Sequence, residues 1–184
     1  MERFQALSAG EERRVREVFA QVPFPRLLGL RLEELGPGSC RMSADMRDDL
    51  RQRYGVMHGG VIAALVDTAV AYAIYPQIPP GREITTVEMK LNFLSSVRDG
   101  GRAVARARVL RLGRTLAVCS CDVGDAQGKP VAVALATYMV IPAPPSVPLP
   151  GASTDAAATR ARKMVPPDGI EPPTQGFSVL RSTD

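Results

Sequence analysis

Apolar side chains recur along this chain with two periods, one typical of helices and one typical of strands. Over residues 9–22 they fall three or four positions apart, which predicts a short amphipathic helix. Pro23 and Pro25 then end that helix, because proline lacks the amide hydrogen that a helix interior needs. Residues 1–24 are therefore predicted to form an N-terminal helical segment.

The most apolar stretch of the chain, residues 61–75, predicts a longer helix that follows Gly59-Gly60 and stops at Pro76. A membrane span is the competing interpretation. Asp67 lies in the middle of the stretch, however, and an acid at the centre of a bilayer costs about 2.5 to 3.5 kcal/mol. The uninterrupted apolar part is also too short to span. We therefore expect a core helix and no membrane.

The remaining elements are predicted to be strands. Residues 86–93 alternate strictly between apolar and polar, so the predicted strand has one apolar and one polar face. The apolar positions are Val87, Met89, Leu91 and Phe93, and the polar positions are Thr86, Glu88, Lys90 and Asn92. Further strands are predicted over 27–35, 39–46, 102–112, 115–123 and 131–141, with turns at Gly36-Pro37-Gly38 and Gly113-Arg114.

The order of these elements predicts the fold class. Consecutive strands joined by short links pair antiparallel, and a single long apolar helix must bury itself against them. The sequence thus predicts an α+β domain over 25–141. Residues 142–184 hold nine of the sixteen prolines and no periodic pattern, which predicts a disordered tail outside the sheet.

Composition narrows the classes of function. The chain has 184 residues, a net charge of +4, one histidine and three cysteines. One histidine excludes a multi-histidine metal site, and the spacing of Cys40, Cys119 and Cys121 does not fit zinc. No aromatic residues alternate with the arginines, so nucleic acid is not an expected partner. Unpaired thiols and a start without a signal-peptide core predict a cytoplasmic protein.

Asp67 is the first candidate for chemistry, because it is the only charged residue between His58 and Tyr75. A carboxylate in such an apolar helix must be paired, solvated or protonated. Two interpretations stay open from the residue type. Asp67 is either a structural acid at a subunit interface, or a catalytic base or nucleophile.

Gly59-Gly60 is the second candidate. Free amides at a helix start carry about half a positive charge and can hold an oxyanion, although such a pair is usually only a turn. His58 just before them is either a capping residue or a catalyst. The sequence contains no G-x-S-x-G nucleophile motif, so a serine hydrolase is not predicted.

Taken together, these residues resemble a family signature. The signature is Gln52-x-x-Gly55-x-x-His58-Gly59-Gly60-x-x-x-x-Leu65-x-Asp67, followed by the segment Thr85-Thr86-Val87-Glu88-Met89-Lys90-Leu91-Asn92-Phe93. It resembles that of the hotdog-fold acyl-CoA thioesterases, in their phenylacetate-degradation (PaaI-like) branch. The resemblance covers residues 25–141. It implies a sheet wrapped around the long helix, subunits that pair their sheets edge to edge, and active sites at the dimer interface of a homodimer or homotetramer.

The resemblance also implies roles for single residues. Asp67 would be the general base for water, or the nucleophile. The Gly59 N–H would bind the thioester oxygen, and Gln52 would position the thioester or the water. His58 would orient the loop, and Thr86 would hold the attacking water. Gln52 stands where many Asp-bearing members have Asn, which leaves the acyl group open.

The expected substrate is an aryl- or fatty-acyl-CoA, with no cofactor and no metal. Six arginines near the predicted hairpin are expected to be mostly a solvated face, although some could bind the phosphates of coenzyme A; they are Arg98, Arg102, Arg106, Arg108, Arg111 and Arg114. Two alternatives stay open: a hydratase or dehydratase acting on acyl chains, and a non-catalytic acyl-CoA-binding regulator. The first would centre on a catalytic histidine in another motif, and the second would want a DNA-binding segment.

Overall fold

The computed structural model describes residues 6–144. Within them, helix α1 spans Ala9–Gln21, as the spacing of apolar residues predicts. Ser8 caps this helix, because its hydroxyl accepts the N–H of Glu11 while the Glu11 carboxylate accepts the N–H of Ser8 at 2.8 Å. Residues 145–184, which are most of the tail predicted over 142–184, and the first five residues lie outside the described part, so the boundaries of the predicted segments stay predictions.

The strand predicted over 27–35 is wrong at its start. A second short helix, α2, spans Pro23–Leu28, and Gly29 ends it with a φ of 67°. Pro23 stands in the first turn of α2, where its missing amide hydrogen costs nothing, so this proline begins a helix as well as following one. Strand β1 therefore starts only at Arg31.

Within residues 6–144, six strands form one antiparallel sheet in the order β1-β2-β4-β5-β6-β3. Their bounds are β1 Arg31–Gly36, β2 Ser39–Asp45, β3 Arg82–Phe93, β4 Arg102–Leu112, β5 Leu116–Gly124 and β6 Pro130–Pro142. Pro142, predicted outside the sheet, is the last residue of β6, where a proline interrupts no inner pairing. Strand β3 pairs with β6 alone and is one edge of the sheet.

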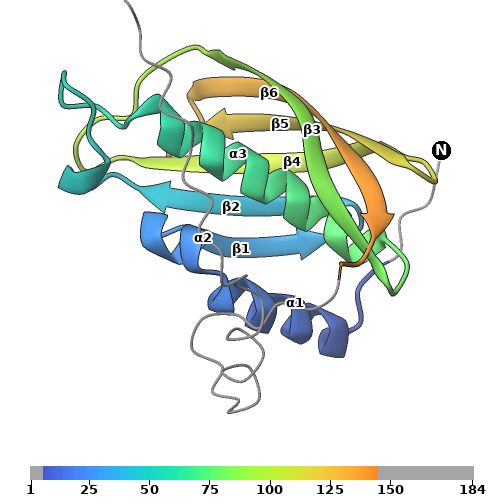
Figure 1. Cartoon of the computed structure of the whole chain (residues 1–184). Coiled ribbons are helices and arrows are strands. Elements are labelled where there is room, and N and C mark those ends of the chain that lie inside the picture. The colour runs from blue at the N-terminus through green and yellow to red at the C-terminus, as the bar shows by residue number, and fades with distance from the viewer. Residues whose placement is uncertain (1–5, 145–184) are drawn as a thin grey trace, which may run out of the picture. The chain divides into compact units, whose positions relative to one another are not determined.

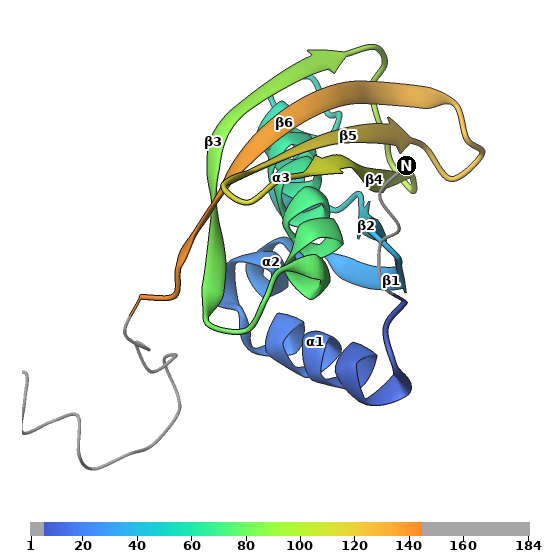
Figure 2. The same cartoon turned by 90° about the vertical axis from the view of Figure 1, so that its right-hand side faces the viewer.

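Helix α3, Gly59–Ile74, lies in the hollow of the curved sheet (Figures 1 and 2). Its buried side chains are Val61, Ile62, Leu65, Val66, Ala69, Val70, Ala73 and Ile74. Facing it from β4 are the buried Ala103, Ala105 and Ala107, whose small side chains let the helix approach the sheet closely. The segment 59–77 is long and apolar enough to cross a membrane by length and composition alone. This packing makes α3 a core helix.

The strict alternation predicted for 86–93 holds from Glu88 to Phe93 but is wrong at its start. A β-bulge between Thr86 and Glu88 inserts one extra residue, so Thr86 pairs with Tyr138 while Met89 pairs with Ala136. Tyr138 and Ala136 are both buried and lie two residues apart on β6. Residues directly opposite on neighbouring strands share a face, so Thr86 and Met89 both face α3. The bulge thus adds a hydroxyl to the apolar face of β3.

Candidate active site

The carboxylate of Asp67 is held by two hydroxyl groups of the sheet. Asp67 is half-buried in the middle of α3, and its side chain bonds to residues of the neighbouring strands β3 and β6. Thr86 Oγ1 donates a hydrogen bond to Oδ1 over 2.9 Å, and the Tyr138 hydroxyl donates to the same oxygen over 2.5 Å. Among the described residues, nothing donates to Oδ2. One carboxylate oxygen is therefore tied down and the other is left open.

Tyr138 is a residue of this site that the sequence analysis missed. Its side chain is only 2% exposed, and its hydroxyl also lies 2.8 Å from the backbone carbonyl oxygen of Asp67. Burial, together with the hydrogen bond to Asp67, raises the pKa of Tyr138 far above its ordinary value. The phenol therefore stays protonated and acts as a donor. The sequence did contain a signal for it, because Tyr138, whose ring ends in a hydroxyl, stands at an inward-facing position of the strand predicted over 131–141.

The start of α3 offers a free amide. His58 is the N-cap, and its Nδ1 accepts the N–H of Gly60 over 2.8 Å. This bond requires a lone pair on Nδ1, so a neutral His58 carries its hydrogen on Nε2. Within the described residues, nothing accepts the N–H of Gly59. The positive end of the helix dipole and this amide together form a place for a developing negative charge.

Gly59 is also required for packing. A Cβ at this position would lie 3.1 Å from the ring of Phe93, at the end of β3. Glycine therefore lets the aromatic ring lie directly over the first turn of α3. The two ends of the candidate site are both lined by β3, with Thr86 at the carboxylate and Phe93 at the amide.

Gln52 does not reach either group within one chain. Its Oε1 accepts the N–H of Tyr54 over 2.7 Å, and its backbone N–H bonds to the carbonyl of Val56. The side chain thus stabilises the loop that leads into His58. The structure brings Asp67 together with Thr86, and His58 together with the two glycines, while Gln52 stays in the loop before them.

The amide and the carboxylate are too far apart to act on one carbonyl group within a single chain. Gly59 and Asp67 are eight residues apart on α3, a rise of about 12 Å at 1.5 Å per residue. A reacting carbonyl must lie about 3 Å from its oxyanion donor and close to the activated water. Within one chain, this amide and this carboxylate therefore cannot contact the same carbonyl group.

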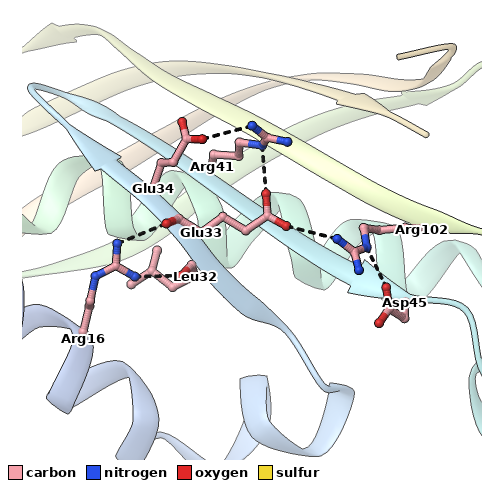
Figure 3. A network of polar contacts seen from close by, with 7 residues as sticks. All are labelled: Arg16, Leu32, Glu33, Glu34, Arg41, Asp45 and Arg102. Carbon is pink, nitrogen blue, oxygen red and sulfur yellow. Dashed lines mark hydrogen bonds and ion pairs between the residues drawn. The ribbon is translucent and has the colours of Figure 1, made fainter. Parts of the chain in front are cut away.

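The arginines near the β4–β5 hairpin divide into two groups. Arg102 is committed to an ion-pair network with Asp45 and Glu33, which also includes Arg41 and extends to Arg16 of α1 (Figure 3). The other five are exposed and form no ion pair within residues 6–144; they are Arg98, Arg106, Arg108, Arg111 and Arg114. Within the same residues, no group of three or more His, Cys, Asp or Glu side chains could hold a metal ion.

Comparison with known proteins identifies the family. A family model described as the thioesterase superfamily matches residues 54–132, which include the start of α3 and Asp67. A protein of Saccharolobus solfataricus described as an esterase, SSO1253, is 31% identical over 137 residues, covering 74% of this chain and 88% of that protein. The chain belongs to the thioesterase superfamily.

Solved structures agree with this assignment. Thioesterase HI1161 from Haemophilus influenzae is 25% identical, with a TM-score of 0.67 over 77% of this chain and 96% of that chain. A variant of PaaI, the phenylacetic acid degradation protein of Thermus thermophilus, is 30% identical, with a TM-score of 0.59 over 64% of this chain and 98% of that chain. The predicted PaaI-like hotdog fold is confirmed, and this thioesterase is a thioester hydrolase.

Proposed function

We propose that this thioesterase hydrolyses an acyl-CoA, and that Asp67 activates the attacking water. The observation that carries the proposal is the open Oδ2 of a carboxylate whose other oxygen accepts two hydroxyl hydrogens. An oxygen with free lone pairs, fixed in direction by its neighbour, suits a general base. Exposed arginines on β4, such as Arg106 and Arg108, offer charge for the phosphates of coenzyme A.

The proposed reaction needs no further group. Oδ2 takes a proton from water while the water oxygen bonds to the thioester carbon, and the carbonyl oxygen becomes an anion bound by the N–H of Gly59. The tetrahedral intermediate then expels the thiolate, which takes the proton back from Asp67. In this scheme His58 and Gln52 hold the loop that presents the Gly59 amide. Direct attack by Oδ2 on the thioester, giving a mixed anhydride, is the variant of the same chemistry.

The site is proposed to be completed by a second copy of the chain. The separation of about 12 Å along α3 means that the amide and the carboxylate must come from different copies to meet one substrate. Strand β3 suits that contact, because it is a long edge strand with Val87, Phe93 and the adjacent Leu94 more than half exposed. A symmetric pair of β3 edges would create two identical sites. We infer a homodimer or homotetramer in the cytoplasm.

The test is hydrolysis of a panel of aryl-acetyl, aromatic and medium-chain fatty acyl-CoAs by the wild-type enzyme and by Asp67→Asn. Asparagine keeps the size of the side chain and still accepts at its oxygen, but it cannot take a proton from water. We expect a loss of kcat of at least about 10²-fold at unchanged oligomeric state. Asp122→Asn, an exposed acid on β5, is the matched control and should hydrolyse as the wild type does.

Hydrolysis that survives in Asp67→Asn would refute the role of the carboxylate. Binding of acyl-CoAs by the wild-type protein without any hydrolysis would favour the regulator over the enzyme. Hydration or dehydration of an enoyl-CoA in place of thioester cleavage would favour the other alternative.

A further inference from the structure

We infer that Tyr138 is a positioning residue for Asp67, and that its hydroxyl, together with Thr86, reserves Oδ1 so that Oδ2 is the reacting oxygen. This inference rests on the proposed function of Asp67. It assigns a task to a residue on the last strand of the sheet, which lies 71 positions from Asp67 in the sequence.

The hydrogen-bond geometry shows where the phenol hydrogen goes. Tyr138 has one hydroxyl hydrogen, and its oxygen lies 2.8 Å from the Asp67 carbonyl oxygen and 2.5 Å from Oδ1, with the Thr86 side chain also in hydrogen-bonding reach. The carboxylate oxygen carries charge and is the closer of the two, so it takes the hydrogen. Thr86 Oγ1 adds a second hydrogen bond to Oδ1. Two donors from two strands fix the plane of the carboxylate, and a base must be held to within a few tenths of an ångström of its productive position.

The surroundings of Tyr138 make it a rigid support. Its backbone pairs with Ala117 of β5 on one side and with Thr86 of β3 on the other, so β6 is held on both edges at this point. The side chain is 2% exposed, so water does not compete for the hydroxyl. A donor that is buried and held on both sides keeps its direction while substrate enters and product leaves.

Asp67 is the carboxyl group of this cluster, and its neighbours from the sheet are two hydroxyls and a thiol. Thr86 faces it from β3 and Tyr138 from β6, and Cys119 on β5 lies close to the Tyr138 hydroxyl. Burial raises the pKa of Cys119 to about 12, so this thiol stays neutral, as the phenol does. Among the described residues, no charged side chain bonds to the carboxylate. A change in its protonation therefore reports the loss of a donor directly.

The experiment compares Tyr138→Phe with Tyr72→Phe. Both variants delete one phenol hydroxyl: Tyr138 reaches α3 from the sheet, and Tyr72 is a residue of α3 itself. Tyr72 packs against Phe19 and does not bond to Asp67. The carboxyl group of Asp67 is titrated by ¹³C NMR in protein with labelled aspartate, and its signal is assigned by its absence in Asp67→Asn. Loss of a charge-assisted donor should move the midpoint up by about one pH unit in Tyr138→Phe and leave it unchanged in Tyr72→Phe.

The pH profile of kcat/KM gives the kinetic reading. The midpoint of its acidic limb should move to higher pH in Tyr138→Phe by the same interval as the NMR midpoint. In the same variant kcat should fall roughly tenfold with KM little changed, because the carboxylate loses its fixed direction. A purely structural role for the hydroxyl would lower activity without moving the limb. Equal NMR midpoints in Tyr138→Phe, Tyr72→Phe and the wild type would overturn the inference.

A second perturbation covers the case in which Tyr138→Phe does not fold. Difluorotyrosine at position 138 keeps the ring and makes the hydroxyl a stronger donor, so the Asp67 midpoint should move down. A midpoint that does not move would again overturn the inference. Because the titration needs no substrate, a shifted midpoint with no hydrolysis by the wild type would refute the proposed function and leave the hydrogen bond from Tyr138 standing.

Discussion

Replacing Gly59 by proline removes the amide hydrogen that we assign to the oxyanion and keeps the start of α3 in place. Proline suits the first position of a helix, because its ring fixes φ near the helical value and the N–H at this position makes no hydrogen bond within the helix. His58 before it has a φ of −63° and a ψ of 136°, in the extended region that a residue before proline prefers. The backbone therefore accommodates the change.

The remaining disturbance is the contact with Phe93. A Cβ at position 59 would lie 3.1 Å from the end of that ring, so the ring must move by a few tenths of an ångström. Gly59→Ala adds the same Cβ but retains the amide hydrogen, so it is the matched control. The difference between the two variants isolates the N–H.

The expected magnitude follows from the role of an oxyanion donor. Loss of one such donor costs about 10² to 10³ in kcat, or about 2.7 to 4 kcal/mol of transition-state stabilisation. We expect that loss in Gly59→Pro, with a KM close to that of wild type and with Gly59→Ala hydrolysing at a rate close to the wild-type rate. The assay is steady-state release of coenzyme A on the best substrate of the panel, at matched oligomeric state. Equal rates for the proline and alanine variants would refute the oxyanion role of Gly59.

Two further predictions concern the fold. Burial raises the pKa of Cys40, Cys119 and Cys121 to about 12. A thiol reagent should therefore label no cysteine in the native enzyme and three cysteines after unfolding. A cysteine that reacts quickly in the native enzyme would contradict this burial. The hydrogen bond from Arg31 holds the pKa of Asp45 below its ordinary value. Ionised Asp45 therefore stabilises the fold at pH values above its unfolded-state pKa of about 4, and this stabilisation is lost as the pH falls. The Tm difference between wild type and Asp45→Asn should therefore shrink on acidification, and a constant difference would contradict the ion pair's role.

The sequence was most informative where local pattern and packing agree. The strand over 102–112 was predicted at its observed bounds. Small apolar residues alternate with arginines along it, so only one face of the strand can turn toward the core. The helix over 61–75 was predicted nearly whole, since its apolar residues have only the sheet to pack against. The short helix α2 was missed because Pro23 and Pro25 both end one helix and permit another to begin.

The site was only half visible in the sequence. Asp67 and Thr86 were both chosen as site residues, and the structure places them in contact. Alternation alone put Thr86 on the wrong face of β3, because a bulge leaves no clear mark in a sequence. Tyr138 was missed because its bond to Asp67 joins distant segments and becomes apparent only when β6 is placed beside β3. In the proposed dimer, the residues that meet between two copies depend on the pairing of the β3 edges, and no local pattern encodes that register.

The most direct test of the account mixes two inactive variants. Asp67→Asn lacks the carboxylate and Gly59→Pro lacks the amide, so neither should hydrolyse the substrate alone. If each site takes its amide from one copy and its carboxylate from the other, a mixed dimer has one intact site and one doubly altered site. Random mixing of equal amounts should then restore about a quarter of the wild-type activity. Mixed dimers that are isolated by two different tags and show no recovered hydrolysis would contradict an active site shared between two copies.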